Sequence, residues 1–350
     1  MTGKKIILTG DRPTGRLHLG HYVGSLANRV RLQDEYDCHF LIADYQVLGD
    51  YLEKAGDVAE NVRQIALDWM SVGMDPEKSA FVVQSHVPQF SELHMYFSML
   101  VSVARLKRNP TIKDELEGRG EVLENMSYGY LGYPVSQAAD ILLFKANLVP
   151  VGEDQVAHIE QTREIARRFN FLFGRGKVVF PEPEALVSET PRLPGLDEKP
   201  PIGPDGFAIP RKMSKSLGNA IALSDPPEEV VKKVTSAFTD PTRLKKTDPG
   251  HPEKCNIYTY YTCFLKSIAP LRKEECAGGK IGCVACKKEL ASALNAFLDP
   301  IRAKRKEFEA QPEKVRKALQ RGTEKGRAEG EATMKEVKEA VGFAYRGLVD

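Results

Sequence analysis

The chain has 350 residues, of which 42% are hydrophobic and 28% are charged, and its formal net charge is +2. This length predicts two domains with enough apolar content to form packed cores. The near-neutral charge excludes a protein that attracts polyanions through a global positive field, so any nucleic acid must be bound by local basic surface. No stretch is long and apolar enough to span a bilayer, and the first residues lead into a strand without a signal peptide, so we expect a cytoplasmic protein.

Strand-like and helix-like segments alternate through the first half of the chain. Short apolar runs predict buried strands at residues 6–8, 38–43, 79–83 and 148–151. Helical spacing of apolar residues predicts helices at 22–32, 58–70, 90–106, 133–144 and 156–169. This alternation predicts an α/β fold, a Rossmann-like doubly wound parallel sheet. Residues 181–210 are rich in proline and glycine and predict a long connection, and the last third of the chain reads as helical.

A turn at residues 9–21 follows the first predicted strand and ends in His18-Leu19-Gly20-His21. A helix that starts beside the carboxyl end of a strand offers unpaired N–H groups to a nucleotide. Both imidazoles can face one bound anion there, and Gly20 lets a flat base lie against the backbone. A P-loop would need Lys-Ser/Thr at His21-Tyr22, and no G-x-G-x-x-G follows the strand, so neither of those sites is predicted. From this motif alone, a turn with two solvated histidines remains an alternative.

A second motif, Lys212-Met213-Ser214-Lys215-Ser216, follows the predicted connection. Together the two motifs resemble the HIGH and KMSKS signatures of class I aminoacyl-tRNA synthetases, in the right order and about 190 residues apart. The resemblance implies that ATP activates an amino acid, which is then transferred to tRNA. Lys212 and Lys215 would contact the departing phosphates and His18 and His21 the α/β region, with Mg²⁺ carried on the phosphates of ATP.

Residues 109–113 and 133–170 resemble the tryptophanyl branch of these synthetases, and the similarity covers roughly residues 4–250. By this resemblance Asp140 would accept the indole N–H, and Tyr133 and Gln155 would hold the α-ammonium group. The other predicted tryptophan-binding residues are Leu8, Gln46 and Gln137. The predicted ATP-binding residues are Arg12, Gly20, Lys113, Gly152, Asp154, Met213 and Ser214.

The choice between tryptophan and tyrosine depends on a few positions. Leu8 favours tryptophan, because the tyrosyl branch places a tyrosine there. Arg12, Gln46 and Gln137 depart from the common bacterial tryptophanyl pattern, which indicates a divergent member. A tyrosyl-tRNA synthetase and a repurposed paralogue that acts as a binding module remain the alternatives to a tryptophan–tRNA ligase.

Four of the six cysteines, Cys255, Cys276, Cys283 and Cys286, supply the ligands for a tetrahedral Zn²⁺ or a [4Fe–4S] cluster. A disulfide framework is not expected in a cytosolic chain. The pattern resembles that of a subset of tryptophanyl-tRNA synthetases with a [4Fe–4S] cluster, although the first gap is slightly shorter here. This resemblance favours the cluster over zinc and over unligated thiols, and Cys38 and Cys263 are expected in cores.

We expect a catalytic domain at residues 1–222, ending in the KMSKS loop, and a helical anticodon-binding domain at 223–350. The expected partners are tRNA(Trp), L-tryptophan and ATP, and the family implies a homodimer. A group of basic residues could contact tRNA phosphates or form a solvated amphipathic helix face. These residues are Arg302, Lys304, Arg305, Lys306, Lys314, Arg316, Lys317 and Arg321.

Overall fold

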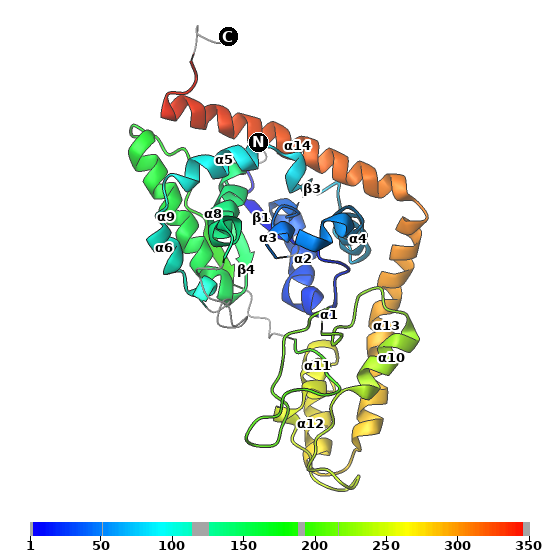
Figure 1. Cartoon of the computed structure of the whole chain (residues 1–350). Helices are drawn as coiled ribbons and strands as arrows, with labels where there is room; N and C mark the ends of the chain where they lie inside the picture. Colours follow the sequence, from blue (N-terminus) through cyan, green and yellow to red (C-terminus); the bar gives the residue numbers. More distant parts are fainter. Residues whose placement is uncertain (1–2, 51, 114–125, 188–192, 216, 346–350) are drawn as a thin grey trace. The chain divides into compact units, whose positions relative to one another are not determined.

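The computed structural model describes residues 3–50, 52–113, 126–187, 193–215 and 217–345. The chain forms two compact units, which are coloured by sequence in Figure 1. The first unit contains Met1–Gly15, Asn28–Glu189 and Gln311–Asp350, and the second contains Arg16–Ala27 and Thr190–Ala310. These units do not follow the predicted boundary after residue 222. The HLGH segment belongs to the second unit and the last long helix to the first, so the predicted domain boundary stays a prediction.

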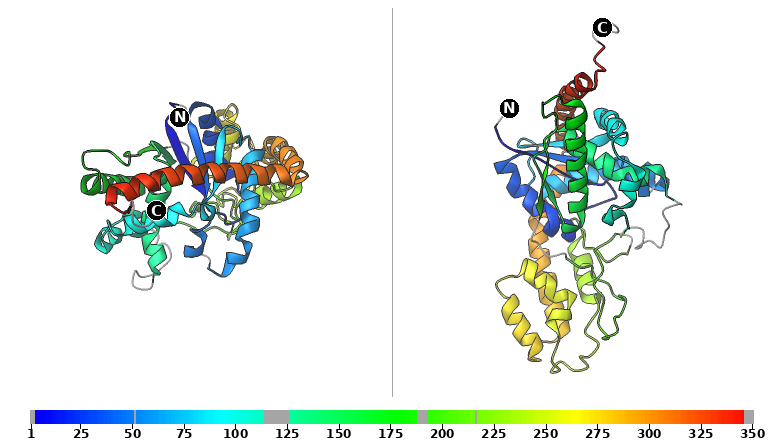
Figure 2. Two further views of the ribbon diagram at one scale, coloured as in Figure 1. Left: turned by 90° about the horizontal axis from the view of Figure 1, so that it is seen from above. Right: turned by 90° about the vertical axis from the view of Figure 1, so that its left-hand side faces the viewer.

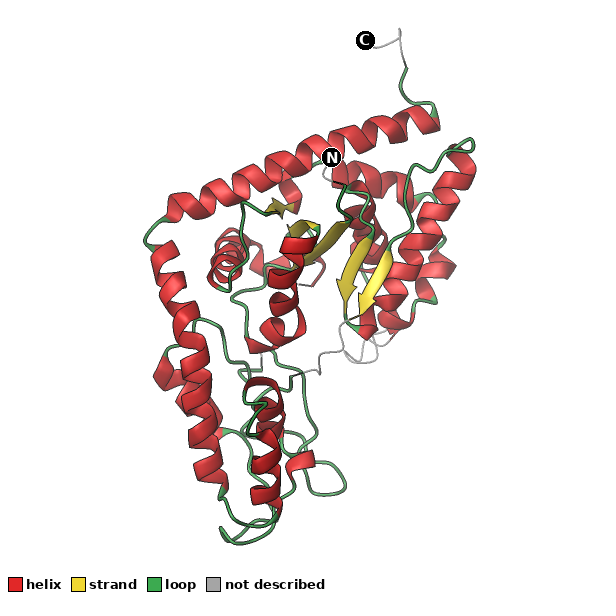
Figure 3. Cartoon of the chain, turned by 180° about the vertical axis from the view of Figure 1, so that it is seen from behind, coloured by secondary structure: helices red, strands yellow, loops and turns green. Residues whose placement is uncertain are grey.

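A five-stranded parallel sheet forms the centre of the first unit, with its strands drawn in yellow in Figure 3. The strands are β1 (Ile6–Asp11), β2 (Asp37–Ile42), β3 (Ser79–Val83), β4 (Leu148–Val151) and β5 (Glu184–Val187). Their order, β3-β2-β1-β4-β5, is that of a doubly wound fold whose direction reverses between β1 and β4. Ile7 of β1 pairs with Cys38 of β2 on one side and with Leu148 of β4 on the other. The predicted fold class is confirmed.

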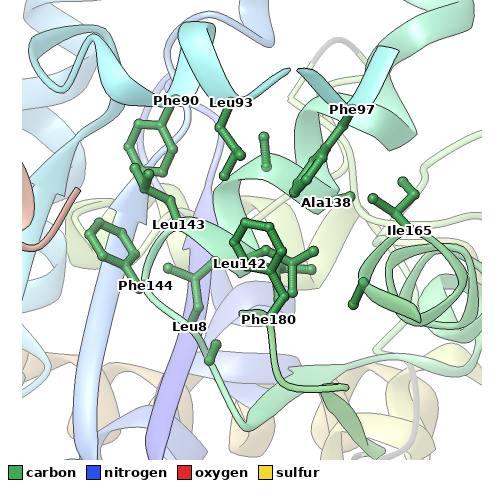
Figure 4. Packing of buried hydrophobic residues seen from close by; sticks show 14 of the residues in the cluster. Leu8, Phe90, Leu93, Phe97, Ala138, Leu142, Leu143, Phe144, Ile165 and Phe180 are labelled. Carbon is green, nitrogen blue, oxygen red and sulfur yellow. The ribbon is translucent and has the colours of Figure 1, made fainter. Parts of the chain in front are cut away.

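Helices pack on both faces of this sheet because neighbouring residues of a strand point to opposite sides. Leu8, Leu41 and Val82 join the hydrophobic core with α5 (Gln89–Ser98), α8 (Tyr128–Leu143) and α9 (Val156–Phe173). Figure 4 shows Leu8 of this core beside Leu142, Phe144 and Phe180. On the opposite face, the rings of Phe40 and Phe81 contact Trp69 of α4 (Val58–Ser71). Trp69 is fully buried in the core.

The helix expected at 22–32 consists of the π-helix η1 (Tyr22–Leu26) followed by α2 (Ala27–Glu35). Two further predicted helices are divided or begin elsewhere in the structure. The single helix expected at 90–106 is divided, because Ser102 Oγ accepts the Arg105 N–H at 3.2 Å and starts a new helix, α6 (Val103–Lys107). Ser127 similarly starts α8, where its Oγ accepts the Tyr130 N–H at 3.1 Å. Pro134 therefore lies inside α8, although the sequence predicts it in the first turn of a helix.

The strand β5 was not predicted, since it lies within the segment expected to be a long connection. Its four residues pair in parallel with β4, from Leu148↔Glu184 to Val151↔Val187. The strand is too short to show a period, and prolines flank it on the N-terminal side. The strand is formed by backbone pairing with β4, and its apolar pattern does not predict it.

The last helix, α14 (Pro312–Val341), packs along β3, the strand at one edge of the sheet. The left view of Figure 2 shows this orange-to-red helix crossing over the strands. A Cβ atom at Gly322 would lie 2.3 Å from the backbone N and O of Phe81, so helix and strand backbones are in contact. Thr323 Oγ1 also accepts the N–H of Val83 at 3.1 Å. The helix therefore covers a strand edge whose backbone groups would otherwise be open.

Replacing Gly322 with alanine is expected to destabilise the protein by about 3 kcal/mol, because the new methyl group would overlap backbone atoms that cannot move aside. Denaturant unfolding measures the change. The matched control is Gly129→Ala in α8, where the nearest atom to the new Cβ is 4.0 Å away and removing a helix glycine should be neutral or stabilising. Equal stabilities of the two variants would contradict the close contact between α14 and β3.

The second unit is mainly helical, in agreement with the helical character predicted for the last third of the chain. Its helices are α1 (Leu19–His21), the π-helix η1 (Tyr22–Leu26), α10 (Pro227–Ser236), α11 (Asn256–Phe264), α12 (Ala269–Ala277) and α13 (Cys283–Glu309). Both α10 and α11 pack against α13. The remaining elements of the chain are α2 (Ala27–Glu35), α3 (Val47–Asp50), η2 (Leu52–Asp57), η3 (Gln84–His86), η5 (Glu153–Gln155) and η6 (Pro252–Lys254).

Candidate active site

A buried carboxylate, Asp140 of α8, lies at the centre of a polar group in the first unit. Its side chain is enclosed, with the residue 3% exposed. Gln46 Nε2 donates to Asp140 Oδ2 at 2.9 Å and Gln84 Nε2 donates to Oδ1 at 2.7 Å. Burial raises the pKa of Asp140 to about 7, and the two amide donors oppose that rise. Each oxygen keeps further lone-pair capacity, so the group can accept a hydrogen bond from a ligand.

Gln84 is a residue that sequence reasoning missed. It is fully buried at the start of η3, directly after β3. Its Oε1 accepts the N–H of Tyr45 at 3.2 Å, which turns its Nε2 towards Asp140. A backbone donor thus fixes the side-chain amide of Gln84. One signal could have identified Gln84 as a site residue: it is a polar residue directly after β3, whose five residues are all buried.

Tyr133 takes part in a second polar group that sequence reasoning also missed. Its hydroxyl lies 2.8 Å from Nε2 of the buried His158, and Asn109 Nδ2 donates to Nδ1 of that ring at 3.1 Å. The orientation of Asn109 is fixed because its Oδ1 accepts the N–H of Thr111. Since Nδ1 is the acceptor, a neutral His158 carries its proton on Nε2 and donates it to Tyr133. The Tyr133 oxygen is then positioned by a buried donor.

The other residues predicted for the first unit lie on several different strands, helices and loops. Leu8 is buried within β1, while Gln46 and Gln137 are half-buried. Arg12, Lys113 and Gly152 are exposed, and Gln155 is half-buried at the end of η5. The Asp154 side chain lies outside the described part of the chain. Because β1 and β4 are neighbours where the strand order reverses, the loops carrying Arg12 and Gly152 leave the sheet at the position where such folds bind ligands.

The HLGH motif begins the helical segment of the second unit. His18 occupies the position before α1 and His21 ends that helix, and their ring centroids are 3.8 Å apart. His21 Nδ1 accepts the backbone N–H of His18 at 3.2 Å. A neutral His21 therefore carries its proton on Nε2, which makes that nitrogen a hydrogen-bond donor for an anion.

The two motifs lie together within the second unit. Residues 17–19 and 221–223 run antiparallel, with Leu19 N–H donating to Ile221 O at 2.9 Å and Leu223 N–H to Leu17 O at 3.0 Å. Met213 is buried, and a Cβ atom at Gly20 would lie 3.4 Å from its sulfur. Lys212 and Lys215 are exposed and Ser214 is half-buried. This pairing places the segment after the KMSKS motif directly beside HLGH.

A family model described as tRNA synthetases class I (W and Y) matches residues 1–299. The chain belongs to this family of class I tRNA synthetases. The tryptophan–tRNA ligase of Clostridium longisporum is 46% identical to it over 349 residues, which covers 98% of each chain. The tryptophan–tRNA ligase of Aquifex aeolicus is 38% identical over 405 residues, covering 96% of this chain and 99% of the relative.

Solved structures of class I synthetases share the fold. The tryptophanyl-tRNA synthetase from Campylobacter jejuni, complexed with ADP and tryptophan, is 32% identical with a TM-score of 0.80 and covers 96% of this chain and 99% of its own. A tyrosyl-tRNA synthetase from Archaeoglobus fulgidus, complexed with L-tyrosine, has a TM-score of 0.64 at 21% identity, covering 87% of this chain and 91% of its own. The second likeness concerns the fold alone.

Two of the four predicted metal ligands of this synthetase lie beside a basic residue in the second unit. Arg243 Nη1 lies 3.5 Å from Cys283 Sγ and 3.9 Å from Cys276 Sγ. Burial raises the pKa of Cys255, and it raises that of Cys286 to about 11. Among the described residues, however, no group of three or more His, Cys, Asp or Glu side chains is arranged to hold a metal ion. Cys38 is buried as predicted, while Cys263 is only half-buried.

Several predicted basic contacts of the synthetase are engaged within the chain. Arg305 is 4% exposed and pairs with Glu309, so it is not available to a tRNA phosphate. Arg302 Nε donates to the Asp225 carbonyl at 2.7 Å, and Arg316 pairs with Glu313. These contacts agree with the alternative of an amphipathic helix face with interspersed glutamates. Within the described residues, none of the helices has the length and apolar character needed to cross a membrane.

Proposed function

We propose that the chain is a tryptophan–tRNA ligase. It activates L-tryptophan with ATP to form tryptophanyl-adenylate and pyrophosphate, and then transfers tryptophan to the 3′-terminal adenosine of tRNA(Trp). The observation that carries the proposal is the enclosed Asp140 carboxylate, held on both oxygens by amide donors and still able to accept one more hydrogen bond. Relatives that match nearly the full chain are tryptophan–tRNA ligases, which supports the same substrate.

The first unit supplies the groups that bind tryptophan. A buried indole N–H requires an acceptor, and leaving it unpaired costs about 1–3 kcal/mol. Asp140 provides that acceptor, while Tyr133 and Gln155 bind the α-ammonium group. The Tyr133 oxygen accepts one hydrogen bond from His158 Nε2. Its second lone pair can accept a hydrogen bond from the ammonium group. Gln46, Gln137 and Leu8 complete the proposed tryptophan-binding residues.

Four residues of the second unit are proposed to bind the phosphates of ATP. In adenylate formation a carboxylate oxygen of tryptophan bonds to the α-phosphorus, the α–β phosphoanhydride bond breaks, and pyrophosphate leaves with the electron pair. His18 and His21 donate to the α/β-phosphate oxygens, and Lys212 and Lys215 neutralise the charge on the leaving group. Mg²⁺ enters with the nucleotide.

The remaining residues proposed for ATP binding contact the phosphates, the adenosine or the backbone around the nucleotide. Lys113 and Arg12 contact the phosphates with cationic side chains. Gly152 and Asp154, at the end of β4, lie along the adenosine. In the second unit, Gly20, Met213 and Ser214 shape the backbone around the nucleotide.

Amino-acid-dependent exchange of pyrophosphate into ATP tests the function. Tryptophan is expected to drive exchange and tyrosine is not, and the purified chain should charge tRNA(Trp). Exchange driven by tyrosine would identify the tyrosyl enzyme. Absence of exchange with all amino acids, in a folded protein that binds tRNA, would identify a repurposed paralogue.

We further propose that the four cysteines hold a [4Fe–4S] cluster, with zinc as the less favoured occupant. The donor type suits the group, because thiolates are the usual ligands of such clusters, and binding would have to bring the four sulfurs together. Cys255 precedes α11, Cys276 lies in α12, and Cys283 and Cys286 form the first turn of α13. The Arg243 guanidinium faces two of the sulfurs, as suits anionic thiolates. A bound cluster would supply a covalent cross-link between the starts of α11 and α13 and the end of α12.

Anaerobic purification is expected to give a brown protein with iron and acid-labile sulfide in equal amounts. Cys283→Ser should lose most of the iron and lower the melting temperature. Cys263→Ser is the matched control, because Cys263 lies outside the proposed ligand set and should keep its iron. Zinc in place of iron, or no metal after anaerobic purification, would contradict the cluster.

The family also supports a homodimer that acts in the cytoplasm. Light scattering at micromolar concentration is expected to give twice the chain mass of 38.9 kDa.

A further inference from the structure

The KMSKS segment is hydrogen-bonded to a short stretch of chain, residues 194–197, which we name the cradle. Pro194 and Lys212 form an antiparallel bridge, and the Gly195 N–H donates to the Arg211 carbonyl at 2.9 Å. The Leu196 N–H donates to the carbonyl of Asn219 at 2.8 Å. The cradle therefore contacts the KMSKS loop at both ends, before Lys212 and after Lys215.

Asn219 closes the loop between these two ends. Its Oδ1 accepts the N–H of Ser214 at 2.8 Å, and its Nδ2 donates to the carbonyl of Lys212 at 3.3 Å. A Cβ atom on Gly195 would lie 2.2 Å from this Nδ2, so only glycine allows the amide to reach its position. One buried side chain thus fixes the backbone on either side of Met213.

Asp197 holds Asn219 in turn. Its two oxygens accept from Asn219 Nδ2, each at 3.2 Å, and it pairs with the Arg211 guanidinium. The residue is 6% exposed, and its carbonyl accepts the Phe238 N–H at 2.8 Å. Burying a carboxylate costs desolvation free energy. The position of Asp197, bonded to residues before and after the KMSKS motif, therefore suggests that its carboxylate has a role in holding that loop.

The cradle is also anchored on its other side, to α11. The Tyr260 hydroxyl donates to the Pro194 carbonyl at 2.8 Å, and Asn256 Nδ2 donates to the Gly195 carbonyl at 3.3 Å. Tyr260 is fully buried. These bonds fix the cradle to α11. Asp197 therefore holds the loop in a fixed position relative to that helix.

We propose that Asp197 is a positioning residue for amino-acid activation. By holding Asn219 and Arg211, it sets the backbone from which Lys212 and Lys215 extend to the leaving pyrophosphate. This inference rests on the proposed function of those lysines. Preorganised charges stabilise a transition state without further reorganisation, and a displacement of about 1 Å costs on the order of 10² in rate.

Asp197→Asn is the first test, because it keeps the shape and one acceptor but removes the charge that pairs with Arg211. We expect kcat for tryptophan-dependent pyrophosphate exchange to fall by about 10- to 100-fold, while KM for tryptophan stays within about twofold. The matched control is Asp205→Asn, an exposed carboxylate that pairs with Lys254 and should leave kcat unchanged.

A double-variant cycle separates positioning from simple loss of folding. If Asp197 acts through the loop lysines, Asp197→Asn should reduce kcat by less than about twofold when Lys212 and Lys215 are both already alanine. A full 10- to 100-fold loss in that background, or no loss in the wild-type background, would overturn the proposal. Binding of tryptophan measured by calorimetry reports whether each variant is folded. Failure of the proposed function is distinguishable, because the wild-type chain would then show no exchange with tryptophan.

Discussion

Replacing Lys215 with alanine is expected to lower kcat for tryptophan-dependent pyrophosphate exchange by about 10²–10³-fold. The lysine lies on an exposed part of the loop and its charge is needed only when negative charge moves onto the departing pyrophosphate. The affinity for tryptophan should therefore be unchanged, since Asp140 and its partners belong to the other unit. Steady-state exchange with varied ATP and tryptophan measures both quantities.

Lys199→Ala is the matched control for this variant. Lys199 is also an exposed lysine of the second unit, and it lies outside both motifs. Removing it changes the net charge by the same amount, so that any loss of general electrostatic attraction for ATP would appear in both variants. Equal loss of kcat in the two variants would contradict a specific role for the KMSKS loop.

Asp140→Asn is expected to raise KM for tryptophan by about 10- to 100-fold, because a hydrogen bond to a charged acceptor contributes about 1.5–3 kcal/mol. The buried amide group of Gln84 is fixed by Tyr45 and cannot turn, so the amide oxygen of the introduced asparagine must face Gln84. The new NH₂ group then replaces the oxygen that accepts from Gln46. Exchange kinetics with tryptophan measure the loss.

A tryptophan analogue with sulfur in place of the indole N–H gives the control for this variant. The wild-type chain should prefer tryptophan over the analogue, and Asp140→Asn should lose most of that preference. An unchanged preference would show that the indole N–H is not bound by Asp140.

Although Asp140→Asn is expected to weaken tryptophan binding, it should increase the stability of the folded chain at neutral to alkaline pH. Burial raises the pKa of Asp140 to about 7 in the folded chain, above its ordinary value of 3.8. The folded state therefore binds more protons than the unfolded state between about pH 4 and 7. Stability contributed by this group is fully present below about pH 4 and falls as the pH rises to about 7. At about pH 8 Asp140→Asn should melt at a higher temperature than the wild type, and at about pH 4 the difference should vanish.

The sequence motifs predicted which segments of the second unit lie close together. HLGH and KMSKS were expected to act on one nucleotide, and the structure pairs the backbone at 17–19 with that at 221–223. Asp140 was assigned through a resemblance, and the structure places it among amide donors inside the fold. Motifs carry such information because their residues are close in sequence and contact one ligand.

The supporting residues could not be predicted in the same way. Gln84 and His158 lie 56 and 25 residues from the groups they bind, and their partners become neighbours only when the sheet and helices have formed. Asp197 lies in a proline-rich stretch that lacks any periodic pattern. The position of α14 was missed for a related reason. Glycine has a low helix propensity, which gives no sign that Gly322 is the point of contact with Phe81 in the folded unit.

The packing of α14 on β3 has a consequence for biosynthesis. The strand ends at Val83 and the helix starts at Pro312, so most of the chain leaves the ribosome while this side of the sheet is still uncovered. An open strand is a template for pairing with neighbouring chains. We therefore expect nascent chains to depend on chaperones until α14 has been synthesised, and a product terminated before Pro312 to accumulate in inclusion bodies.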